Sequence, residues 1–362
     1  MTTAPTRDRD RDLDLRADLA VRGVRVEAPV RRTGGAGPSD DGHLVLLGLP
    51  TTLRVAGDSP YSVEGDRLFK DGLLLEAEIA PVTRPAFYDL ATSDGVAMEQ
   101  VARLHGKDVL APTVIQTCTR YADEATRCGF CAIERSLEAG VTTAVKTPAQ
   151  LGEVAAAAVA LDGVRSMVLT TGTTPGSDRG AAHLVRCVRA VRAAVPDIAV
   201  QVQCEPPDDL AWLRRLHTAG ARTIGIHAEA LEERIRARWT PGKATVPLSA
   251  YDVAWDEAVR VFGRNRVSTY VLVGLGEDAD ELVEACGRLI DRGIYPFVVP
   301  FRPLAGTLAV DVDGVSAPDP GLVAGISARV AAQLQAAGMR GADEGAGCAA
   351  CGACGLLAAA GG

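Results

Sequence analysis

The chain has 362 residues, of which 47% are apolar, and a formal net charge of −8 at neutral pH. Its length is enough to bury a large core in one or two domains. Its negative charge argues against a nucleic-acid-binding surface, which needs a basic face. No apolar run approaches the ~18 residues typical of a membrane span, and the charged start is typical of neither a signal nor a transit peptide. Nine cysteines in a chain without an export-signal pattern favour metal-binding or redox roles over disulfide bonds. They predict a cytoplasmic protein without membrane partners.

The amino-terminal part of the chain predicts a small α+β region. Residues 1–15 alternate both charges and are expected to form a disordered tail, and a short helical pattern covers 13–21. The α+β region itself spans residues 16–105. Short strands are predicted at 43–49 and within 61–79, and a hairpin turn is predicted at Lys70-Asp71-Gly72.

A glycine-rich segment interrupts this region at residues 31–39. A phosphate-binding loop needs a preceding strand and a Gly-Lys-Ser or Gly-Lys-Thr ending, and the segment has neither. We interpret it as an ordinary loop.

Residues 106–310 predict a parallel sheet covered by helices, because apolar runs of strand length alternate with helical stretches rich in Ala, Leu and Val. Six such units fall short of the eight that close a full barrel, so we expect an α/β fold with a partial (β/α)6 TIM-like barrel. The strands are predicted at 109–118, 166–171, 199–205, 223–228, 267–274 and 296–302. The helices are predicted at 149–161, 181–194, 208–219, 230–238, 250–262 and 279–292.

Three cysteines with C-x9-C-x2-C spacing, Cys118, Cys128 and Cys131, follow the first predicted barrel strand. Three converging thiolates repel one another unless a soft metal centre neutralises them, and three ligands leave one coordination position open, as in catalytic centres. The long Cys118–Cys128 loop adds only ~1 kcal/mol of closure cost, against the ~10–16 kcal/mol that a structural metal site supplies. Zinc needs a fourth ligand, which no neighbouring residue offers, so a [4Fe–4S] cluster fits better.

Cys128-Gly-Phe-Cys131, at the end of the first strand of a β/α series, resembles the cluster motif of the radical S-adenosylmethionine (SAM) superfamily. The resemblance implies an enzyme whose open iron binds SAM, and whose reduced cluster cleaves it to a 5′-deoxyadenosyl radical that abstracts hydrogen from a substrate. It also implies a reducing partner such as flavodoxin or ferredoxin. The usual spacing is C-x3-C-x2-C, so this chain departs from the family between Cys118 and Cys128.

Later strand ends extend the resemblance over residues 105–310. Thr171-Gly-Thr173 stands where the family holds the SAM amino group, although it lacks the acidic residue found there. Gly274 and Glu277 match two positions of the adenine-supporting motif, and Glu229 and Arg236 resemble the SAM-binding stretch of biotin and lipoyl synthases. The candidate SAM-binding residues are Phe130, Thr171, Gly172, Thr173, Glu205, Glu229, Arg236, Gly274 and Glu277.

Three further polar residues carry two interpretations each. Glu205 follows the alternation of Gln201 and Gln203 on one strand face, which points it into the barrel; a solvated strand end is the alternative. His227 is either a functional strand-end residue or a satisfied core histidine. Arg302 is either a clamp for a substrate carboxylate or a structural salt-bridge partner.

Residues 311–362 predict a helix at 318–337 and a cysteine-rich tail. Cys348, Cys351 and Cys354 stand at C-x2-C-x2-C spacing, similar to the first three ligands of a bacterial ferredoxin run. We expect a second, auxiliary iron–sulfur cluster, with zinc or a redox-active free tail as alternatives. Cys187 and Cys286 lie in helical patterns and are expected in the core, with a remote fourth ligand as the alternative.

The sequence therefore predicts a radical SAM enzyme that acts on a small molecule. The odd spacing and the cysteine-rich tail resemble a subfamily encoded beside nitrilases, which implies a nitrile- or amino-acid-related substrate. Two rivals stay open: a sulfur-inserting synthase that consumes the tail cluster, and a non-catalytic iron–sulfur electron-transfer protein. The second rival predicts no SAM binding.

Overall fold

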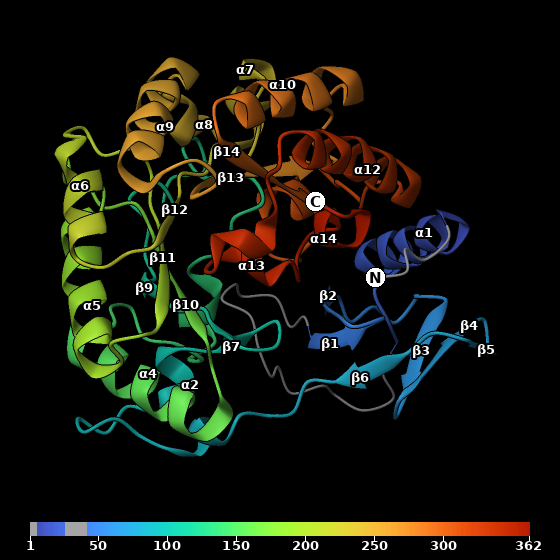
Figure 1. Cartoon of the computed structure of the whole chain (residues 1–362), viewed down its shortest axis with the longest axis horizontal. Coiled ribbons are helices and arrows are strands. Elements are labelled where there is room, and N and C mark those ends of the chain that lie inside the picture. The colour runs from blue at the N-terminus through green and yellow to red at the C-terminus, as the bar shows by residue number, and fades with distance from the viewer. Residues whose placement is uncertain (1–5, 26–41) are drawn as a thin grey trace.

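The computed structural model describes residues 6–25 and 42–362. Figure 1 shows a barrel of strands and helices on one side and two small amino-terminal sheets on the other. Between them, α1 (Thr6–Arg22) packs against α12 (Pro320–Ala336), so the two ends of the chain meet. The glycine-rich segment 31–39 lies outside the described residues.

One mainly parallel sheet forms the barrel. The strand order is β14-β13-β12-β11-β10-β8-β7, with β9 pairing beside β8 on β10. All neighbours are parallel except the β7–β8 pair at one end. The order ends at β14 and β7, so the curled sheet is a partial barrel and the predicted fold class is confirmed. The bounds are β7 Leu104–His105, β8 Val109–Leu110, β9 Thr113–Ile115, β10 Ser166–Thr171, β11 Ala199–Gln203, β12 Thr223–Gly225, β13 Val267–Val273 and β14 Ile294–Pro300.

Three predicted strands differ from the structure in ways that bear on the site. The first predicted strand is broken into β8 and β9 around Pro112, because proline has no N–H to donate to a sheet ladder. The strands β11 and β12 end at Gln203 and Gly225. Glu205 and His227 therefore lie on the loops that follow these strands.

The six predicted barrel helices form, and all of them except α7 cover the outer face of the sheet (Figure 1). Local signals set their ends: Thr147 and Gln150 form a capping box at the start of α4, and Asp278 caps α10. The bounds are α4 Pro148–Asp162, α5 Ala181–Ala194, α6 Ala211–Thr218, α7 Glu233–Trp239, α9 Leu248–Phe262 and α10 Ala279–Asp291. Short connecting helices are η1 Ala86–Asp89, α2 Met98–Val101, α3 Arg135–Glu138, α8 Pro241–Ala244 and α11 Leu308–Asp311.

The amino-terminal region contains two three-stranded antiparallel sheets, of order β2-β1-β6 and β3-β4-β5. Asp71 and Gly72 make the predicted turn between β4 and β5, both with positive φ. The expected disordered tail was wrong for residues 6–15, because α1 starts at Thr6 and buries Leu13 and Ala17 against the carboxy-terminal helices. The bounds are β1 Gly42–Leu46, β2 Leu49–Leu53, β3 Tyr61–Glu64, β4 Arg67–Lys70, β5 Leu73–Leu75 and β6 Ile79–Pro81.

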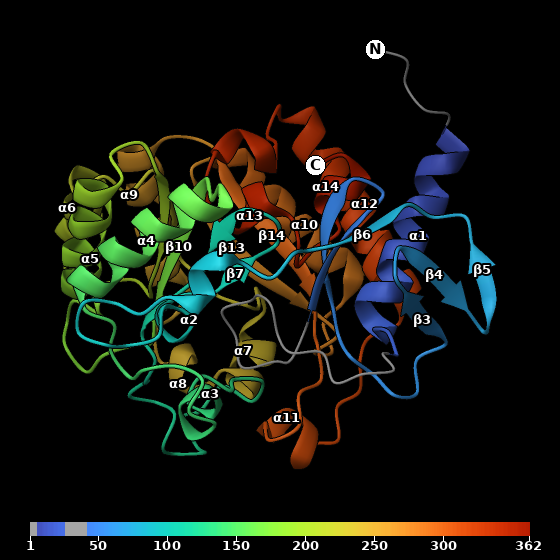
Figure 2. The same cartoon turned by 90° about the horizontal axis from the view of Figure 1, so that it is seen from below.

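The carboxy-terminal tail is folded. After the predicted helix α12 come η2 (Gly341–Glu344), α13 (Cys348–Cys351) and α14 (Leu357–Ala360). Arg222 and Arg266, which directly precede β12 and β13, both donate to the Glu344 carbonyl. In Figure 2, α3, α7 and α8 gather at one end of the barrel while α13 lies at the other. The tail therefore closes the amino-terminal end of the parallel strands.

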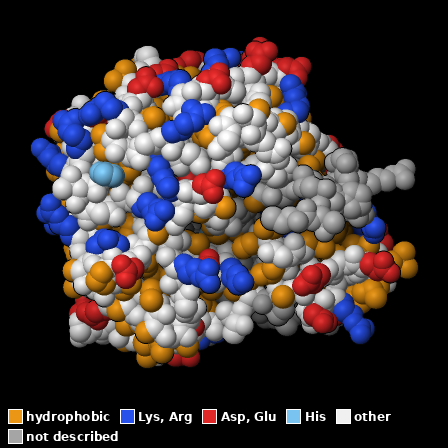
Figure 3. Space-filling view, in the orientation of Figure 1, with side chains coloured by type: hydrophobic (Ala, Val, Ile, Leu, Met, Phe, Trp, Pro, Cys, Tyr) orange, Lys and Arg blue, Asp and Glu red, His pale blue; other side chains and the backbone are white. Residues whose placement is uncertain are grey.

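Charged side chains of both signs are mixed over the face shown in Figure 3, and basic ones gather at its left edge near α5 and α6. Exposed Arg214 on α6 pairs with Glu257 at 2.7 Å, so part of this basic charge is neutralised locally. No helix within the described ranges is both long and apolar enough to cross a bilayer.

Candidate active site

The first cysteine motif lies on the loop after β9, at the carboxyl end of the strands, where ligands of parallel sheets bind. The Cys118 N–H donates to Glu134 Oε1 at 3.3 Å. Gly172, just after β10, comes so close to the Thr117 carbonyl oxygen that a Cβ at position 172 would overlap it. Glycine at 172 thus lets the end of β10 approach the cysteine loop.

Cys128-Gly-Phe-Cys131 packs on the end of α7. The Gly129 N–H donates to the Trp239 carbonyl at 2.7 Å, and a Cβ on Gly129 would lie 2.9 Å from the Trp239 ring. Trp239 is itself held by its indole N–H, which donates to the Leu275 carbonyl at 2.8 Å. The loop is therefore positioned by a buried indole.

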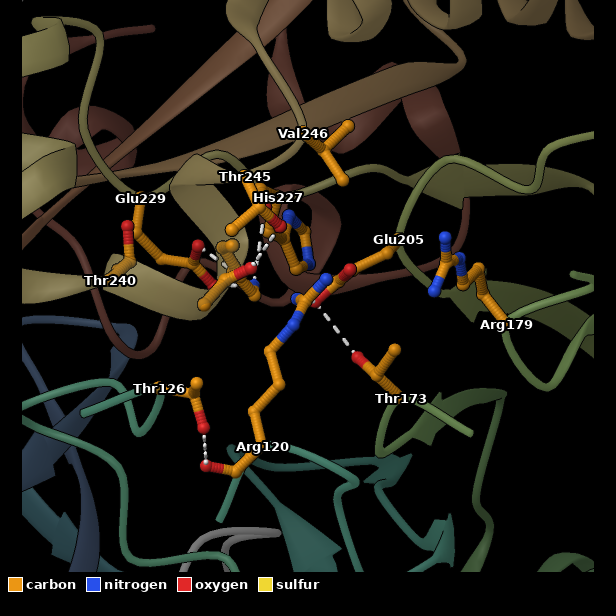
Figure 4. Close-up of polar contacts among 12 residues, drawn as sticks. Arg120, Thr126, Thr173, Arg179, Glu205, His227, Glu229, Thr240, Thr245 and Val246 are labelled. Atoms are coloured by element: carbon orange, nitrogen blue, oxygen red, sulfur yellow. Dashed lines mark hydrogen bonds and ion pairs between the residues drawn. The ribbon is translucent and has the colours of Figure 1, made fainter. Parts of the chain in front are cut away.

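The nine-residue insert, residues 119–127, is anchored to α8. The Gly242 N–H donates to the Thr126 carbonyl at 3.1 Å, and Thr126 Oγ1 donates to the Arg120 carbonyl at 3.0 Å. The Arg120 side chain then reaches across the barrel mouth and pairs with Glu205 (Figure 4). The insert thus supplies a cation to the barrel mouth.

Burial keeps the thiols of Cys128 and Cys131 protonated at neutral pH in the chain alone. Burial raises the pKa of Cys128 well above its ordinary value and that of Cys131 to about 11. Metal binding would therefore release protons from these thiols, because thiolates are the ligands.

The three thiols fit a cluster better than a single ion. Within residues 6–25 and 42–362, no three His, Cys, Asp or Glu side chains converge closely enough to share one metal ion. Zinc needs all its ligands within bonding distance of one centre. A [4Fe–4S] cluster is held at separate iron corners, and three cysteines satisfy all but one of them. Cys118, Cys128 and Cys131 are the residues that would hold it.

Glu205 lies at the barrel mouth, on the loop after β11. Thr173 Oγ1 donates to its Oε1 at 2.8 Å, and Arg120 pairs with the same oxygen (Figure 4). The second oxygen, Oε2, is buried and has no partner in the described structure. A buried, unpaired carboxylate oxygen is costly, so this atom is suited to accept a hydrogen bond from a ligand ammonium.

A second charged pair lies on the same side. Lys243 Nζ bonds both carboxylate oxygens of Glu229, at 2.6 and 2.8 Å, and also donates to the His227 carbonyl at 3.3 Å. Burial alone lowers the pKa of Lys243, but the Glu229 carboxylate raises it well above its usual value. Lys243, Glu229 and Glu205 all act on the pKa of Cys128, so both charged pairs lie close to the first cysteine site.

Arg236, which was predicted to contact SAM, bonds to the backbone of α8 and the loop after it through Nη2, while its Nε is buried without a partner in the described chain. It is fully buried and donates to the carbonyls of Lys243 and Val246 at 3.1 and 2.8 Å. It therefore holds the loop that carries Lys243.

The other predicted residues shape the backbone of the site. Glu277 accepts from the N–H groups of Gly274 and Leu275 at 2.6 and 2.8 Å. Gly274 has a φ of +109°, and a Cβ there would lie 2.8 Å from Pro318. Thr171 Oγ1 donates to the Gly172 carbonyl at 2.9 Å. These residues hold the backbone of the loops after β13 and β10. Their neighbours would therefore make the contacts with a ligand.

His227 is a neutral imidazole. Burial, and then the charge of Lys243, lower its pKa to about 3. Its Nδ1 accepts from the Tyr270 N–H at 3.1 Å, so Nε2 carries the hydrogen, and this atom is buried without a partner in the described chain.

The tail cysteines lie inside the barrel, each against a side chain or glycine of the sheet. Gln203 Nε2 donates to Cys348 Sγ at 3.2 Å, and Cys354 Sγ lies 3.2 Å from His105 Nε2. Cys351 packs on Gly106, where a Cβ would overlap its sulfur. Cys187 and Cys286 are buried in separate hydrophobic clusters on α5 and α10, as expected for core residues.

The sequence did not predict which residues pair with Glu205, Glu229 and the tail cysteines. Arg120 carried a weak signal as one of the two arginines of an unusual insert. Lys243 gave no signal beyond its position shortly after Arg236. His105 and Gln203 gave no signal as neighbours of the tail, because contacts across 249 and 145 positions depend on the whole fold.

Comparison with known proteins relates the barrel segment of the chain to one family. The sequence profile of the Radical SAM superfamily matches residues 118–289, a span that begins at Cys118. Over 112 residues the chain is 26% identical to bacteriochlorophyllide c C-7(1)-hydroxylase of Chlorobaculum limnaeum, covering 30% of this chain and 28% of that protein. The match thus spans less than a third of that relative.

Similar solved structures include methylornithine synthase (PylB), with 15% identity, TM-score 0.49, and 70% and 69% of the two chains covered. HydG, a maturase of the [FeFe]-hydrogenase, has 15% identity, TM-score 0.46, and covers 64% of this chain and 49% of its own. The profile match starts at the first cysteine and contains the strands β10, β11, β12 and β13. Residues 118–289 of this chain are a domain of the Radical SAM superfamily.

Proposed function

We propose that this protein is a radical SAM enzyme that abstracts a hydrogen atom from a small molecule. In this proposal Cys118, Cys128 and Cys131 hold a [4Fe–4S] cluster with one open iron for SAM. With one electron from a donor such as flavodoxin or ferredoxin, the bound cluster and SAM supply methionine and a 5′-deoxyadenosyl radical, which takes hydrogen from the substrate to give 5′-deoxyadenosine. The substrate is left as a radical.

One observation supports the proposal most strongly: the free Oε2 of Glu205. The SAM methionyl group carries an ammonium and a carboxylate, and the site has an acceptor for the first. Thr173 and Arg120 hold Glu205 from its other oxygen, so Oε2 keeps its direction when a ligand arrives. The ion pairs also lie beside Cys128, where a ligand on the open iron would be anchored.

Calorimetric titration of SAM into anaerobically reconstituted protein tests this role. Glu205→Gln should weaken SAM binding about tenfold, which is ~1.4 kcal/mol, because the charge-assisted bond to the ammonium is lost. Glu284→Gln, an exposed change on α10, is the control and should bind as the wild type does. Equal affinity of wild type and Glu205→Gln would remove Glu205 from the SAM site, and no binding at all would favour the electron carrier.

We also propose an auxiliary iron–sulfur cluster on Cys348, Cys351 and Cys354. These thiols are half-buried, and burial raises the pKa of Cys348 to about 12. The fold places Gln203 and His105 against two of the sulfurs, as the outer hydrogen bonds of a cluster require. Iron analysis of the Cys118→Ala/Cys128→Ala/Cys131→Ala variant tests it: about four irons per chain are expected to remain, and an iron-free protein would contradict the assignment.

A further inference from the structure

A cavity of about 460 Å³ lies between the two cysteine sites. Phe130 and Ala132, on either side of Cys131, line one part of it, and Cys354 and Tyr270 line another. Much of the remaining wall is apolar, with Leu272, Val299 and Phe301 among its residues. The cavity therefore has the mixed lining of a small-molecule site and borders the segments that carry both cysteine motifs.

Two arginines supply the charge of this cavity. Arg302 follows β14, and Arg54 follows β2 in the amino-terminal region, so the guanidinium groups come from positions far apart in the chain. No Asp or Glu is among the residues that line the cavity. Among the described lining residues, a ligand in this space therefore meets positive charge without a neutralising carboxylate.

Neither arginine is satisfied within the described chain. The Nε atoms of Arg54 and Arg302 are buried and have no hydrogen-bond partner there. Arg302 uses only Nη2, which donates to the Cys354 carbonyl at 3.0 Å. Arg54 also borders a neighbouring hollow that contains Asp58, yet the two form no ion pair in the described residues. Buried guanidinium hydrogens without acceptors are costly, which favours an anionic ligand.

We propose that this cavity binds a small molecule with a carboxylate group, held by Arg302 and Arg54, as the substrate of the proposed reaction. A guanidinium matches a carboxylate with two parallel hydrogen bonds and stays charged when buried. The apolar wall then receives the carbon skeleton of the ligand on the Phe130 side, toward the candidate SAM site. The inference rests on the proposed function for the ligand's role, but the binding of a carboxylate does not depend on it.

The carboxylate of SAM is the alternative ligand for the two arginines. Glu205, Glu229 and Lys243, the charged groups beside Cys128, are absent from the cavity lining, whereas Cys354 of the tail is present. The arginines therefore belong to the side of the cavity that faces the tail. This geometry favours a second molecule over the methionyl end of SAM.

Ligand-detected NMR with a matched pair of probes tests the inference: 4-methylpentanoate and its neutral amide, 4-methylpentanamide, which have the same shape. The wild type should bind the acid at least about tenfold more tightly than the amide. Arg302→Gln and Arg54→Gln should each remove most of this preference, and Arg302→Lys should restore part of it. The control is Arg165→Gln, because the Arg165 side chain is 84% exposed and does not line the cavity.

A second arm separates this inference from the proposed function. S-adenosylhomocysteine should bind wild type, Arg302→Gln and Arg54→Gln with equal affinity. Equal binding of acid and amide, no binding of the acid at millimolar concentrations, or a parallel loss of S-adenosylhomocysteine in the arginine variants would overturn the inference. Carboxylate binding by a protein that cleaves no SAM would sustain it and refute the proposed function alone.

Discussion

Gln203 on β11 donates a hydrogen bond from Nε2 to the Sγ of Cys348 at 3.2 Å, across 145 positions of the chain. The same Nε2 donates to Gln201 Oε1 at 2.9 Å, and that oxygen also accepts from the Cys348 N–H at 3.2 Å. Two inward-facing glutamines thus hold both the thiol and the backbone of the first tail cysteine. The barrel interior serves as the docking surface of the tail.

Gln203→Leu should loosen the tail. The apolar side chain removes the donor to Cys348, so the Cys348 thiol should react with a maleimide several-fold faster in the metal-free protein. Gln100→Leu, which breaks a bond to the Gly140 carbonyl away from the tail, is the matched control. A labelling rate at Cys348 that is the same in both variants would show that Gln203 does not hold the tail.

Gly129→Ala and Gly325→Ala should have opposite effects on stability. The first adds a methyl group 2.9 Å from the Trp239 ring and is expected to cost ~1–3 kcal/mol through overpacking. The second lies in an exposed position of α12 with open space around it, so it should gain ~0.5–1 kcal/mol of helix stability. Urea unfolding of both variants measures the difference, and two changes of equal sign would contradict the packing described for the cysteine loop.

The Glu229–Lys243 pair should be strongly coupled. Lys243→Met leaves a buried carboxylate without its partner and should cost ~3–5 kcal/mol. Glu229→Gln/Lys243→Met should be less unstable than the sum of the single changes, because neither charge is then left alone. A double-mutant cycle by urea unfolding measures the coupling, and strictly additive losses would show that the two groups act independently.

His227 should make the fold sensitive to acid. Its folded pKa of about 3 lies below its ordinary value of 6.5, so the unfolded chain binds more protons between these pH values. The titration of His227 therefore leaves the free energy of unfolding unchanged above pH ~6.5. It lowers that free energy by up to a few kcal/mol as the pH falls toward ~3. His227→Gln should flatten the unfolding free energy over that interval, measured by urea titrations at several pH values. An unchanged pH profile would contradict the neutral, buried imidazole.

The sequence predicted the barrel well because its strands and helices are long and strongly patterned. Ser166–Thr171 and Ala181–Ala194 form with the predicted bounds. The break at Pro112 and the early start of α1 were missed: a single proline divides an apolar run, and α1 is stabilised by α12 at the far end of the chain. The residue pattern around each segment therefore does not fully predict the strand break at Pro112 or the start of α1.

The site was predictable where spacing or order along the chain carries meaning. Cys118, Thr173 and Glu229 were predicted at strand ends, and the structure brings them to one edge of the sheet, because the carboxyl ends of parallel strands meet there. The bonds of the buried Arg236 guanidinium to backbone carbonyls were not predicted. Arg54 and Arg302 line the same cavity because the amino-terminal region docks on the barrel, and no local sequence pattern encodes that docking.

The most direct test of the central claim is the amount of 5′-deoxyadenosine formed from SAM by anaerobically reconstituted, dithionite-reduced protein. The wild type and Cys286→Ala, which changes a buried core cysteine, should form it together with an equal amount of methionine. Cys118→Ala and Cys128→Ala should form none above the rate without protein. 5′-Deoxyadenosine formation by either of these variants at the wild-type rate would contradict the assignment of Cys118, Cys128 and Cys131 as the SAM-cleaving site.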